Sequence, residues 1–313
     1  LPLSRHLHSL LEAIGLEVPS YLPNPKIKNL SCDSQNIENG DLFLGLKGEK
    51  VDGGIYWDKA LALGACAAII SKDASRLNPL SKDKPVVVCP DPIALWIGKL
   101  AAEFWREPSS KFSLIGVTGT NGKTTTSYLI EFLSSSIGIP SALLGTLVNR
   151  WPSYEETAIH TTSFAVPLQA QFDRAVNAGV ELVAMEVSSH ALSQHRVAGC
   201  HFSGAIFTNL SRDHLDYHDS METYFNAKAN LFRPPLLKVG NDRAIVNVDD
   251  GWGSLLANDL KQKCWTCSLD KDSKNSRKID LFYTDLQISS DGCTGKLHTP
   301  AGSGNFISPL VGE

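Results

Sequence analysis

A glycine-rich run at residues 116–126, GVTGTNGKTTT, constrains this chain more than any other stretch. It follows an apolar segment, residues 112–117, that is typical of a buried β-strand. It precedes residues 124–137, where apolar side chains recur at helical spacing. The run therefore stands at a helix N-terminus, where unpaired backbone N–H groups and the helix dipole form an anion site. This arrangement predicts a loop that holds nucleotide phosphates.

The lysine and hydroxyl side chains of this loop indicate the ligand. Lys123 can reach the β- and γ-phosphates of a nucleotide, and the Thr124 hydroxyl can bind Mg²⁺. The general P-loop has a glycine five residues before Gly122, where Val117 stands, so this is a shorter form of the motif. A tight turn without a ligand is the alternative. The residues predicted to bind ATP are Gly119, Thr120, Asn121, Gly122, Lys123, Thr124 and Thr125.

Two further apolar segments end in side chains that suit a metal site. Residues 181–187 predict a strand that carries Glu186 near its end, and residues 205–210 predict a strand that leads to His214. Because the carboxyl ends of parallel strands form the ligand crevice, Glu186 is expected to face the phosphates. Mg²⁺ prefers oxygen ligands, which a carboxylate supplies. Imidazole is a poor Mg²⁺ ligand, so a capping or core role is the alternative for His214.

The alternation of apolar strands and helices predicts an α/β fold. Residues 1–108 carry short strands and a closing amphipathic helix, and residues 107–110 contain Pro and Ser that break the pattern. We predict a small N-terminal α/β substrate domain over residues 1–108. A P-loop-type ATPase domain with a mostly parallel sheet is predicted over residues 109–313. Alternating residues at 280–298 predict an antiparallel hairpin.

Composition excludes several classes of function. The net charge of −4, with no basic patch, gives no support for nucleic-acid binding. No apolar run approaches the roughly 20 residues of a membrane span, and the first residues lack the plan of a secretory signal. The seven cysteines are scattered, which indicates a reducing compartment. We therefore expect a cytoplasmic enzyme without nucleic-acid binding or membrane insertion.

Three segments together resemble the Mur ligase family: GTNGKTT at 119–125, MEVSSHALSQHRV at 185–197 and FTNLSRDHLDYHDSMETYFNAKANLF at 207–232. The resemblance extends over almost the whole chain. It implies an ATP-dependent amide ligase that activates a carboxylate as an acyl phosphate, which an amino acid then attacks. The implied substrate is UDP-MurNAc-L-Ala-D-Glu. The implied reaction adds the third residue in peptidoglycan synthesis, with roles in cell-wall biogenesis, cell shape and cell division. Meso-diaminopimelate is the commoner added residue in the family, and L-lysine is the alternative.

The resemblance also implies a role for Lys228 that the residue pattern does not indicate. The lysine would be carbamylated by CO₂, and its carbamate oxygens would help to hold a second Mg²⁺. A free lysine, with a pKa of about 10.4, would be repelled by metal, whereas a carbamate supplies anionic oxygen. A solvated helix lysine is the alternative. The predicted catalytic residues are Lys123, Glu186, His214 and Lys228, and the predicted ligands of two Mg²⁺ ions are Thr124, Glu186, His214 and Lys228.

The resemblance further implies how the UDP-linked peptide is bound. The Cys-Asp-Ser run ending at Ser34 resembles a motif that contacts the uridine nucleotide, although Gln35 stands where arginine is usual. Arg196 has an independent argument, because a guanidinium binds carboxylates in a bidentate manner. Capping a turn or a helix is the alternative for Ser34 and Thr161. The predicted substrate-binding residues are Cys32, Ser34, Glu49, Lys50, Val51, His160, Thr161, Thr162, Ser188, Gln194 and Arg196.

Two other interpretations stay open. Folylpolyglutamate synthase shares the ATPase core and the activation of a carboxylate, but it does not need the Ser34 motif or the peptide contacts around Arg196. A nucleotide-binding module without catalysis, such as a switch GTPase, would need a base-specificity motif such as N-K-x-D, which this sequence lacks. Family members continue beyond the equivalent of residue 313 into a C-terminal domain that orients the amino acid. We therefore expect a monomeric fragment that binds substrate but does not ligate by itself.

Overall fold

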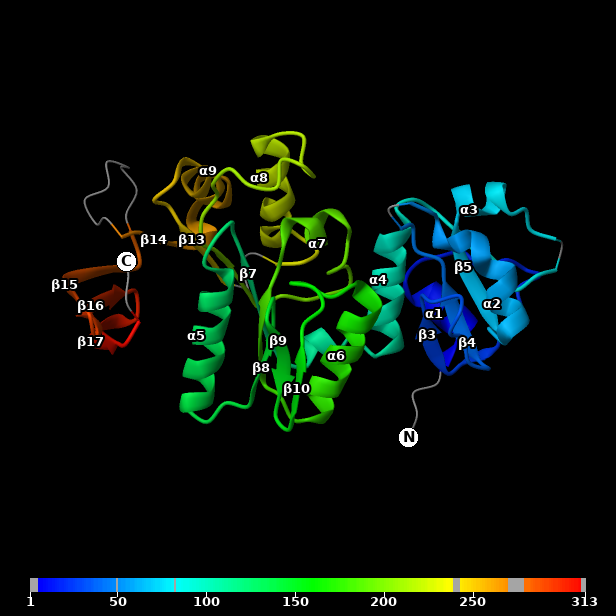
Figure 1. The fold of residues 1–313 in the computed structure, drawn as a ribbon, viewed down its shortest axis with the longest axis horizontal. Coiled ribbons are helices and arrows are strands. Elements are labelled where there is room, and N and C mark those ends of the chain that lie inside the picture. The colour runs from blue at the N-terminus through cyan, green and yellow to red at the C-terminus, as the bar shows by residue number, and fades with distance from the viewer. Residues whose placement is uncertain (1–4, 49, 82, 239–242, 270–278, 311–313) are drawn as a thin grey trace.

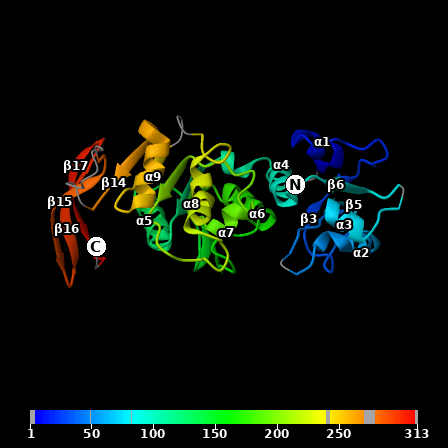
Figure 2. The same ribbon diagram turned by 90° about the horizontal axis from the view of Figure 1, so that it is seen from above.

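The computed structural model describes residues 5–48, 50–81, 83–238, 243–269 and 279–310. In this part of the chain, a parallel sheet lies near the N-terminus, a larger and mostly parallel sheet follows, and a small antiparallel sheet lies near the C-terminus (Figure 1). Seen from above, the three parts follow one another along the long axis of the molecule (Figure 2). The predicted α/β fold with a mostly parallel central sheet is confirmed.

The N-terminal part contains a four-stranded parallel sheet between two layers of helices and a separate two-stranded antiparallel sheet. Its elements are β1 (Arg5–His6), α1 (Leu7–Ala13), β2 (Lys26–Ile27), β3 (Asn29–Ser31), β4 (Asp41–Leu44), η1 (Gly53–Tyr56), α2 (Trp57–Leu63), β5 (Ala67–Ser71), α3 (Lys72–Leu77), β6 (Val86–Cys89), α4 (Ile93–Phe104) and η2 (Pro108–Ser110). Because side chains alternate across a strand, Leu42 and Leu44 of β4 join a core with α1 and α4. Phe43 joins a second core with Trp57 of α2 and Ala74 of α3. Apolar residues at consecutive positions are therefore explained by burial on both faces.

The central part contains the larger sheet. Its elements are β7 (Ser113–Thr118), α5 (Lys123–Ser136), β8 (Ser141–Leu144), β9 (Val148–Trp151), β10 (Tyr154–Thr157), α6 (Ala165–Asn177), β11 (Leu182–Glu186), α7 (Ser189–Ser193), β12 (Gly204–Phe207), α8 (Met221–Ala229), η3 (Asn230–Phe232), β13 (Arg243–Asn247), α9 (Gly251–Leu260), η4 (Lys261–Lys263) and β14 (Cys264–Cys267). In the described residues, the strand order is β10-β9-β8-β11-β7-β12-β13-β14. The strands from β8 to β14 in this order pair in parallel, and the β9–β10 hairpin extends one edge antiparallel.

The first strand in the chain order of this sheet, β7, lies in the middle, between β11 and β12. Glu186 at the end of β11 pairs with Val117, and Phe207 at the end of β12 pairs with Thr118. All three strands therefore end at the same level and at the same edge. In sheets of this kind, the crevice where the strand order reverses is the usual place for a ligand.

Tight packing through α4 joins the N-terminal part to the central part. A Cβ atom on Gly98 would lie 2.6 Å from the Cβ of Ala198, and one on Gly199 would lie 2.7 Å from the Cβ of Ala102. Val166 of α6 also belongs to the core that contains α1 and α4. The backbones can approach this closely only because the facing residues are small.

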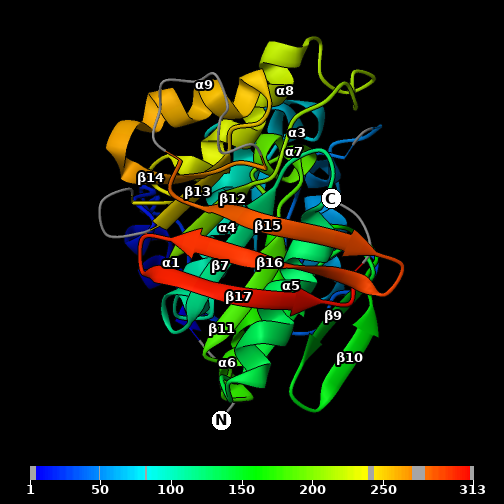
Figure 3. The same cartoon turned by 90° about the vertical axis from the view of Figure 1, so that its left-hand side faces the viewer.

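The antiparallel sheet near the C-terminus consists of β15 (Phe282–Ser289), β16 (Gly292–Thr299) and β17 (Gly302–Ser308), and Figure 3 shows it face-on with α5 behind it. The predicted hairpin at residues 280–298 is confirmed. The sequence did not indicate β17, because glycines interrupt its apolar alternation. The seven cysteines are all described, and none forms a disulfide. Every helix of the described residues is too short or too polar to cross a lipid bilayer.

Candidate active site

The predicted strand, loop and helix around residue 120 are confirmed. β7 ends at Thr118 and α5 begins at Lys123. Gly119 has a φ of +147°, and a Cβ atom there would lie 1.9 Å from the Thr208 hydroxyl oxygen, so only glycine fits. Gly122, with a φ of +80°, precedes the helix, and no side chain among the described residues caps it. The first N–H groups of α5 are therefore left for an anion.

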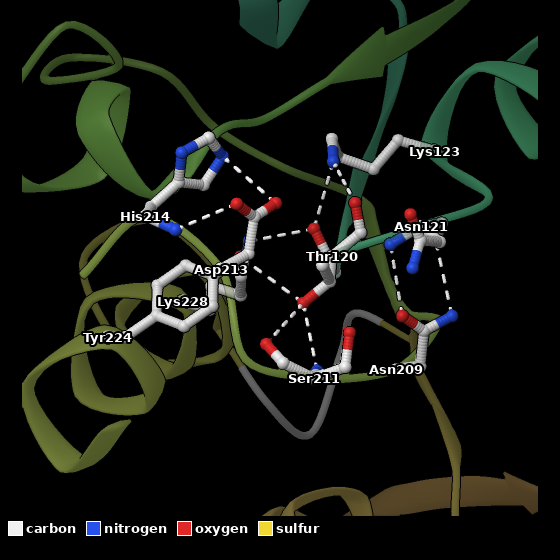
Figure 4. Close-up of polar contacts among 10 residues, drawn as sticks. Thr120, Asn121, Lys123, Asn209, Ser211, Asp213, His214, Tyr224 and Lys228 are labelled. Atoms are coloured by element: carbon white, nitrogen blue, oxygen red, sulfur yellow. Dashed lines mark hydrogen bonds and ion pairs between the residues drawn. The ribbon is translucent and has the colours of Figure 1, made fainter. Parts of the chain in front are cut away.

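Two lysines meet at this loop. The Lys123 ammonium donates hydrogen bonds to the carbonyl oxygens of Gly119 at 2.9 Å and Thr120 at 2.8 Å, and Lys228 of α8 donates to the same Gly119 oxygen at 2.7 Å (Figure 4). Lys228 is 1% exposed. Burial, together with the charge of Lys123, lowers the pKa of Lys228 to about 7, although Asp213 acts in the opposite direction. Burial also lowers the pKa of Lys123.

Glu186 is completely buried at the end of β11. Its carboxylate accepts hydrogen bonds from the Thr124 hydroxyl at 3.0 Å, from the Thr146 backbone N–H at 2.9 Å and from the Thr146 hydroxyl at 3.0 Å. A Cβ atom on Gly145 would lie 2.4 Å from its Oε1, so glycine makes room for the carboxylate. Among the described residues, only neutral donors bind it. Such a buried carboxylate attracts a cation.

His214 lies in the loop between β12 and α8, beside Lys228. Its backbone φ is +50°, in the left-handed region. The backbone N–H of His214 donates to one oxygen of the Asp213 carboxylate at 2.8 Å, and the ring Nε2 lies 3.6 Å from the other oxygen (Figure 4). Tyr224 of α8 places its ring 4.6 Å from the Lys228 Nζ. Ser220 and Thr223 form a capping box that starts α8 and thereby orients Tyr224 and Lys228.

Arg196 is held on three sides. Its guanidinium lies 3.9 Å above the Phe164 ring. It donates to the Thr162 carbonyl oxygen at 2.9 Å, and its Nε and one terminal nitrogen donate to the Gln194 amide oxygen at 2.9 and 2.7 Å. A guanidinium has five N–H groups. Within the described residues three of them make these bonds, which leaves two for a ligand. Burial lowers the pKa of Arg196, which nevertheless stays a cation.

The structure brings most of the predicted central-part residues to one cavity of about 450 Å³. Those that line it are Thr120, Asn121, Gly122, Lys123, Thr124, His160, Thr161, Thr162, Glu186, Ser188, Arg196, His214 and Lys228. A larger and more open cavity, of about 660 Å³, lies between α5 and the β9–β10 hairpin. None of the predicted site residues lines it, so the smaller cavity is the candidate site.

The other predicted residues lie outside this cavity. Gly119 reaches the two lysines through its carbonyl oxygen, Gln194 contacts Arg196, and Thr125 is exposed on α5. The N-terminal residues lie in two loops that follow β3 and β4, at the carboxyl edge of the N-terminal sheet. They are Cys32, Ser34, Lys50 and Val51. Glu49 lies outside the described residues.

Several polar residues at the cavity were missed from the sequence. The Thr208 hydroxyl donates to the Asn121 carbonyl oxygen at 2.6 Å, and the Asn209 side chain accepts from the Asn121 N–H at 3.0 Å. Both follow the end of β12, so the strand-end rule that found Glu186 could have found them. Thr146 follows β8, which was not identified as a strand. The Tyr224 hydroxyl, 3.2 Å from the Thr120 hydroxyl, had no signal in the sequence.

Comparison with known protein families matches both parts of the chain. Residues 26–105 match the family model described as "Mur ligase family, catalytic domain", and residues 117–313 match "Mur ligase middle domain". A UDP-N-acetylmuramoyl-L-alanyl-D-glutamate--2,6-diaminopimelate ligase of Prochlorococcus marinus (strain NATL1A) is 67% identical over 311 residues. The aligned region covers 99% of this chain and 61% of that relative, so the chain spans about three-fifths of its length.

Solved structures agree with this relationship. One of a UDP-N-acetylmuramoyl-L-alanyl-D-glutamate--2,6-diaminopimelate ligase superposes with a TM-score of 0.80 at 32% identity, over 97% of this chain and 60% of the other. A folylpolyglutamate synthase from Mycobacterium tuberculosis, complexed with ADP and AMPPCP, gives a TM-score of 0.53 at 16% identity. That match covers 70% of this chain and 55% of the other, and it shows a shared fold alone. With a family model over residues 117–313 and a relative 67% identical, the chain belongs to the Mur ligase family.

Proposed function

We propose that this chain carries the UDP-substrate and ATP-binding parts of a ligase that adds meso-diaminopimelate to UDP-MurNAc-L-Ala-D-Glu. The γ-phosphoryl group of ATP would move to the substrate carboxylate, and the amine of the incoming amino acid would then displace phosphate. We place the division of the two parts between residues 108 and 109, within the short helix η2. The observation that carries the proposal is one cavity shared by the loop at residues 120–124, the buried Glu186 and the guanidinium of Arg196.

ATP phosphates fit the loop that begins α5. The uncapped helix N-terminus supplies N–H donors, and Lys123 lies beside it with its ammonium on the carbonyl oxygens of Gly119 and Thr120. A phosphate is a stronger acceptor than a carbonyl, so Lys123 turns to the nucleotide when it binds. Its role in the transfer is to stabilise the charge on the phosphate oxygens.

Magnesium fits the residues around Glu186. The carboxylate is completely buried, and among the described residues its hydrogen-bond donors are all neutral, although the charge of Lys123 acts on it electrostatically. Thr124, Glu186, His214 and a carbamate of Lys228 would hold two Mg²⁺ ions together with phosphate oxygens and water. The ions would supply charge neutralisation as the phosphoryl group moves.

Carbamylation of Lys228 is supported by the surroundings of its amine. Lys228 is buried, and its ammonium shares a carbonyl oxygen with that of Lys123. Burial and the neighbouring charge lower its pKa to about 7, so a large fraction of the amine is neutral near neutral pH. The neutral nitrogen attacks the carbon of CO₂, an N–C bond forms and one proton leaves. The product exchanges a repelled cation for an anion beside Lys123.

Arg196 is the proposed reader of the substrate carboxylate. Two of its guanidinium N–H groups remain after the bonds to Gln194 and Thr162, and a carboxylate can accept both. The Thr162 hydroxyl donates to the Glu186 carbonyl oxygen at 2.9 Å and accepts from the Ser188 N–H at 3.1 Å. The peptide contacts are thus built on the same strand end as the metal site. His160, Thr161 and Ser188 complete the proposed peptide contacts, and Cys32, Ser34, Lys50 and Val51 are proposed to bind the uridine nucleotide.

Calorimetry on the 313-residue chain tests this function. We expect binding of UDP-MurNAc-L-Ala-D-Glu and no binding of tetrahydrofolate, the substrate class of the folylpolyglutamate synthases that share the fold. UDP-MurNAc-L-Ala, which lacks the second residue, should bind more weakly. Arg196→Lys should weaken binding of the dipeptide form about tenfold without changing that of UDP-MurNAc-L-Ala.

The control is Arg243→Lys, which changes an exposed arginine of β13. Equal losses for both UDP ligands in Arg196→Lys would exclude a contact of Arg196 with the D-Glu residue, since UDP-MurNAc-L-Ala ends in a carboxylate of its own. Binding of tetrahydrofolate without binding of the dipeptide form would replace the proposed function by the folate ligase. Separate titrations with ATP and with GTP test the interpretation as a nucleotide-binding module without catalysis, since a GTPase module would prefer GTP.

A further inference from the structure

His214 occupies a place where its ring needs external support. It lies in an irregular segment of mostly exposed residues between β12 and α8, and its backbone is in the left-handed region. Its side chain is 43% exposed, and the ion-pair distance to Asp213 is 3.6 Å. Loops of this kind move more than the elements they connect. A metal ligand must be held within a fraction of an ångström, so other contacts must fix the ring.

Two aromatic rings hold the His214 side chain. The His190 ring lies edge-to-face against it, with ring centroids 5.0 Å apart and an interplanar angle of 90°. The Tyr224 ring lies edge-to-face at 5.9 Å and 81°. Tyr224 is buried in α8, and His190 lies in α7, which packs against α8. The His214 ring is therefore held between two helices by contacts of a favourable geometry.

His190 is itself fixed from the peptide side of the cavity. The Tyr217 ring packs against it at 4.1 Å, and the Tyr217 hydroxyl accepts a hydrogen bond from the Gln194 side-chain amide at 3.4 Å. The amide oxygen of Gln194 accepts the two bonds from Arg196. An unbroken series of contacts thus connects Arg196, through Gln194, Tyr217 and His190, to His214.

We propose that His190 is a positioning residue that fixes the His214 ring at the phosphate end of the cavity, and that the Tyr217 ring, from the same segment as His214, packs on the His190 ring beside it. The inference rests on the proposed function for the role of His214 as a metal ligand. The ring packing itself is independent of that role. His190 acts through the shape of its ring, so a phenyl ring of similar size at this position would serve as well.

Two measurements on the 313-residue chain test this positioning. The first follows the ring signals of His214 by NMR in protein free of nucleotide and metal, with His214→Gln as the assignment control. The second is the affinity for Mn²⁺ in the presence of an ATP analogue, measured by calorimetry. In His190→Ala the ring signals of His214 should broaden or average, and the Mn²⁺ affinity should fall about two- to tenfold. In His190→Phe both should stay as in the parent chain.

The matched control is His298→Ala, which removes a histidine ring stacked on Phe282 in the distant antiparallel sheet. It should alter neither readout. A fixed His214 ring in His190→Ala would overturn the proposal. So would a His190→Phe variant as defective as His190→Ala, because the imidazole nitrogen rather than ring packing would then matter. If His214→Gln leaves the Mn²⁺ affinity unchanged, the proposed metal site fails, while the ring signals still decide whether His190 positions His214.

Discussion

The ammonium groups of Lys123 and Lys228 donate hydrogen bonds to one carbonyl oxygen, that of Gly119, at 2.9 and 2.7 Å. The two lysines are separated by more than a hundred residues and come from α5 and α8. Two cations on one acceptor repel each other, which favours loss of a proton from the more buried one. At this loop, Lys123 can bind phosphate as a cation, and Lys228 can lose its proton and become neutral.

Replacing the buried lysine should stabilise the protein in a pH-dependent manner. Lys228 has a folded pKa of about 7, against about 10.4 for an ordinary lysine. Between these values the unfolded chain binds more protons, so the free energy of unfolding of the parent chain rises with pH. The cost of burying the charge is fully present below about pH 7 and disappears near pH 10. Lys228→Met should therefore gain most stability at pH 6, on the order of a few kcal/mol.

Urea denaturation at pH 6, 8 and 9.5, in buffer free of metal and CO₂, measures this difference. The control is Lys59→Met, which removes an exposed lysine of α2. A gain of stability in Lys228→Met that is equal at the three pH values would contradict the lowered pKa.

A carbamate should be detectable on Lys228 directly. With ¹³C-labelled bicarbonate, the chain should show a carbamate carbon signal by NMR, and Lys228→Ala should lose it, since its burial provides the neutral amine that CO₂ requires. Lys111→Ala, which removes an exposed lysine before β7, should keep the signal. A signal that survives in Lys228→Ala would belong to another lysine, and the absence of any signal would argue against the modification.

Lys123→Ala should weaken the binding of ATP with Mg²⁺. Loss of a charged hydrogen bond to phosphate costs about 1.5–3 kcal/mol, or ten- to a hundredfold in the dissociation constant. Calorimetric titration measures it, with Lys111→Ala as the surface control. Unchanged affinity in Lys123→Ala would mean that the phosphates bind elsewhere.

Gly119→Ala should destabilise the fold far more than an alanine at another left-handed glycine. Its φ is +147°, and the added Cβ would lie 1.9 Å from the Thr208 hydroxyl oxygen. Gly138, with a φ of +82° and no atom within 4 Å of a built Cβ, is the matched control. The control should lose about 1 kcal/mol from backbone strain, and Gly119→Ala should lose several times as much because the strand β12 must move. Equal midpoints of urea denaturation for Gly119→Ala and Gly138→Ala would show that the loop around residue 119 relaxes to accommodate the added methyl group.

The part of this fold that could be predicted from sequence is the part whose causes are local. Apolar runs with polar ends located β7 and β11, and the glycines of the loop marked the start of α5. The strand-end rule therefore predicted that Glu186 lies beside Lys123, and both line the same cavity.

The rest depends on contacts between distant segments. In the sequence, Lys228 looks like a solvated helix residue. In the structure it is buried, and its ammonium donates to the carbonyl oxygen of Gly119, which lies 109 positions away in the chain. The β9–β10 hairpin turns through Pro152 and Ser153, and Ser153 has a φ of +67°, so the glycine that marks most two-residue hairpin turns is missing. Thr146, which holds Glu186 through two donors, was missed with β8.

The packing of Gly98 against Ala198 affects the distance between the N-terminal part and the central part of the protein. This close approach holds α4 of the N-terminal part against the segment that follows Arg196 in the central part. In the proposed function, the N-terminal part binds the uridine end of the substrate, and the central part binds its carboxylate. The distance between the two binding sites would then have to match the distance between the uridine end and the carboxylate of the substrate before phosphate is transferred. In the proposed function, a UDP substrate that is one residue too short or too long would therefore hold its carboxylate away from the phosphate loop, although the contact between Gly98 and Ala198 never touches it.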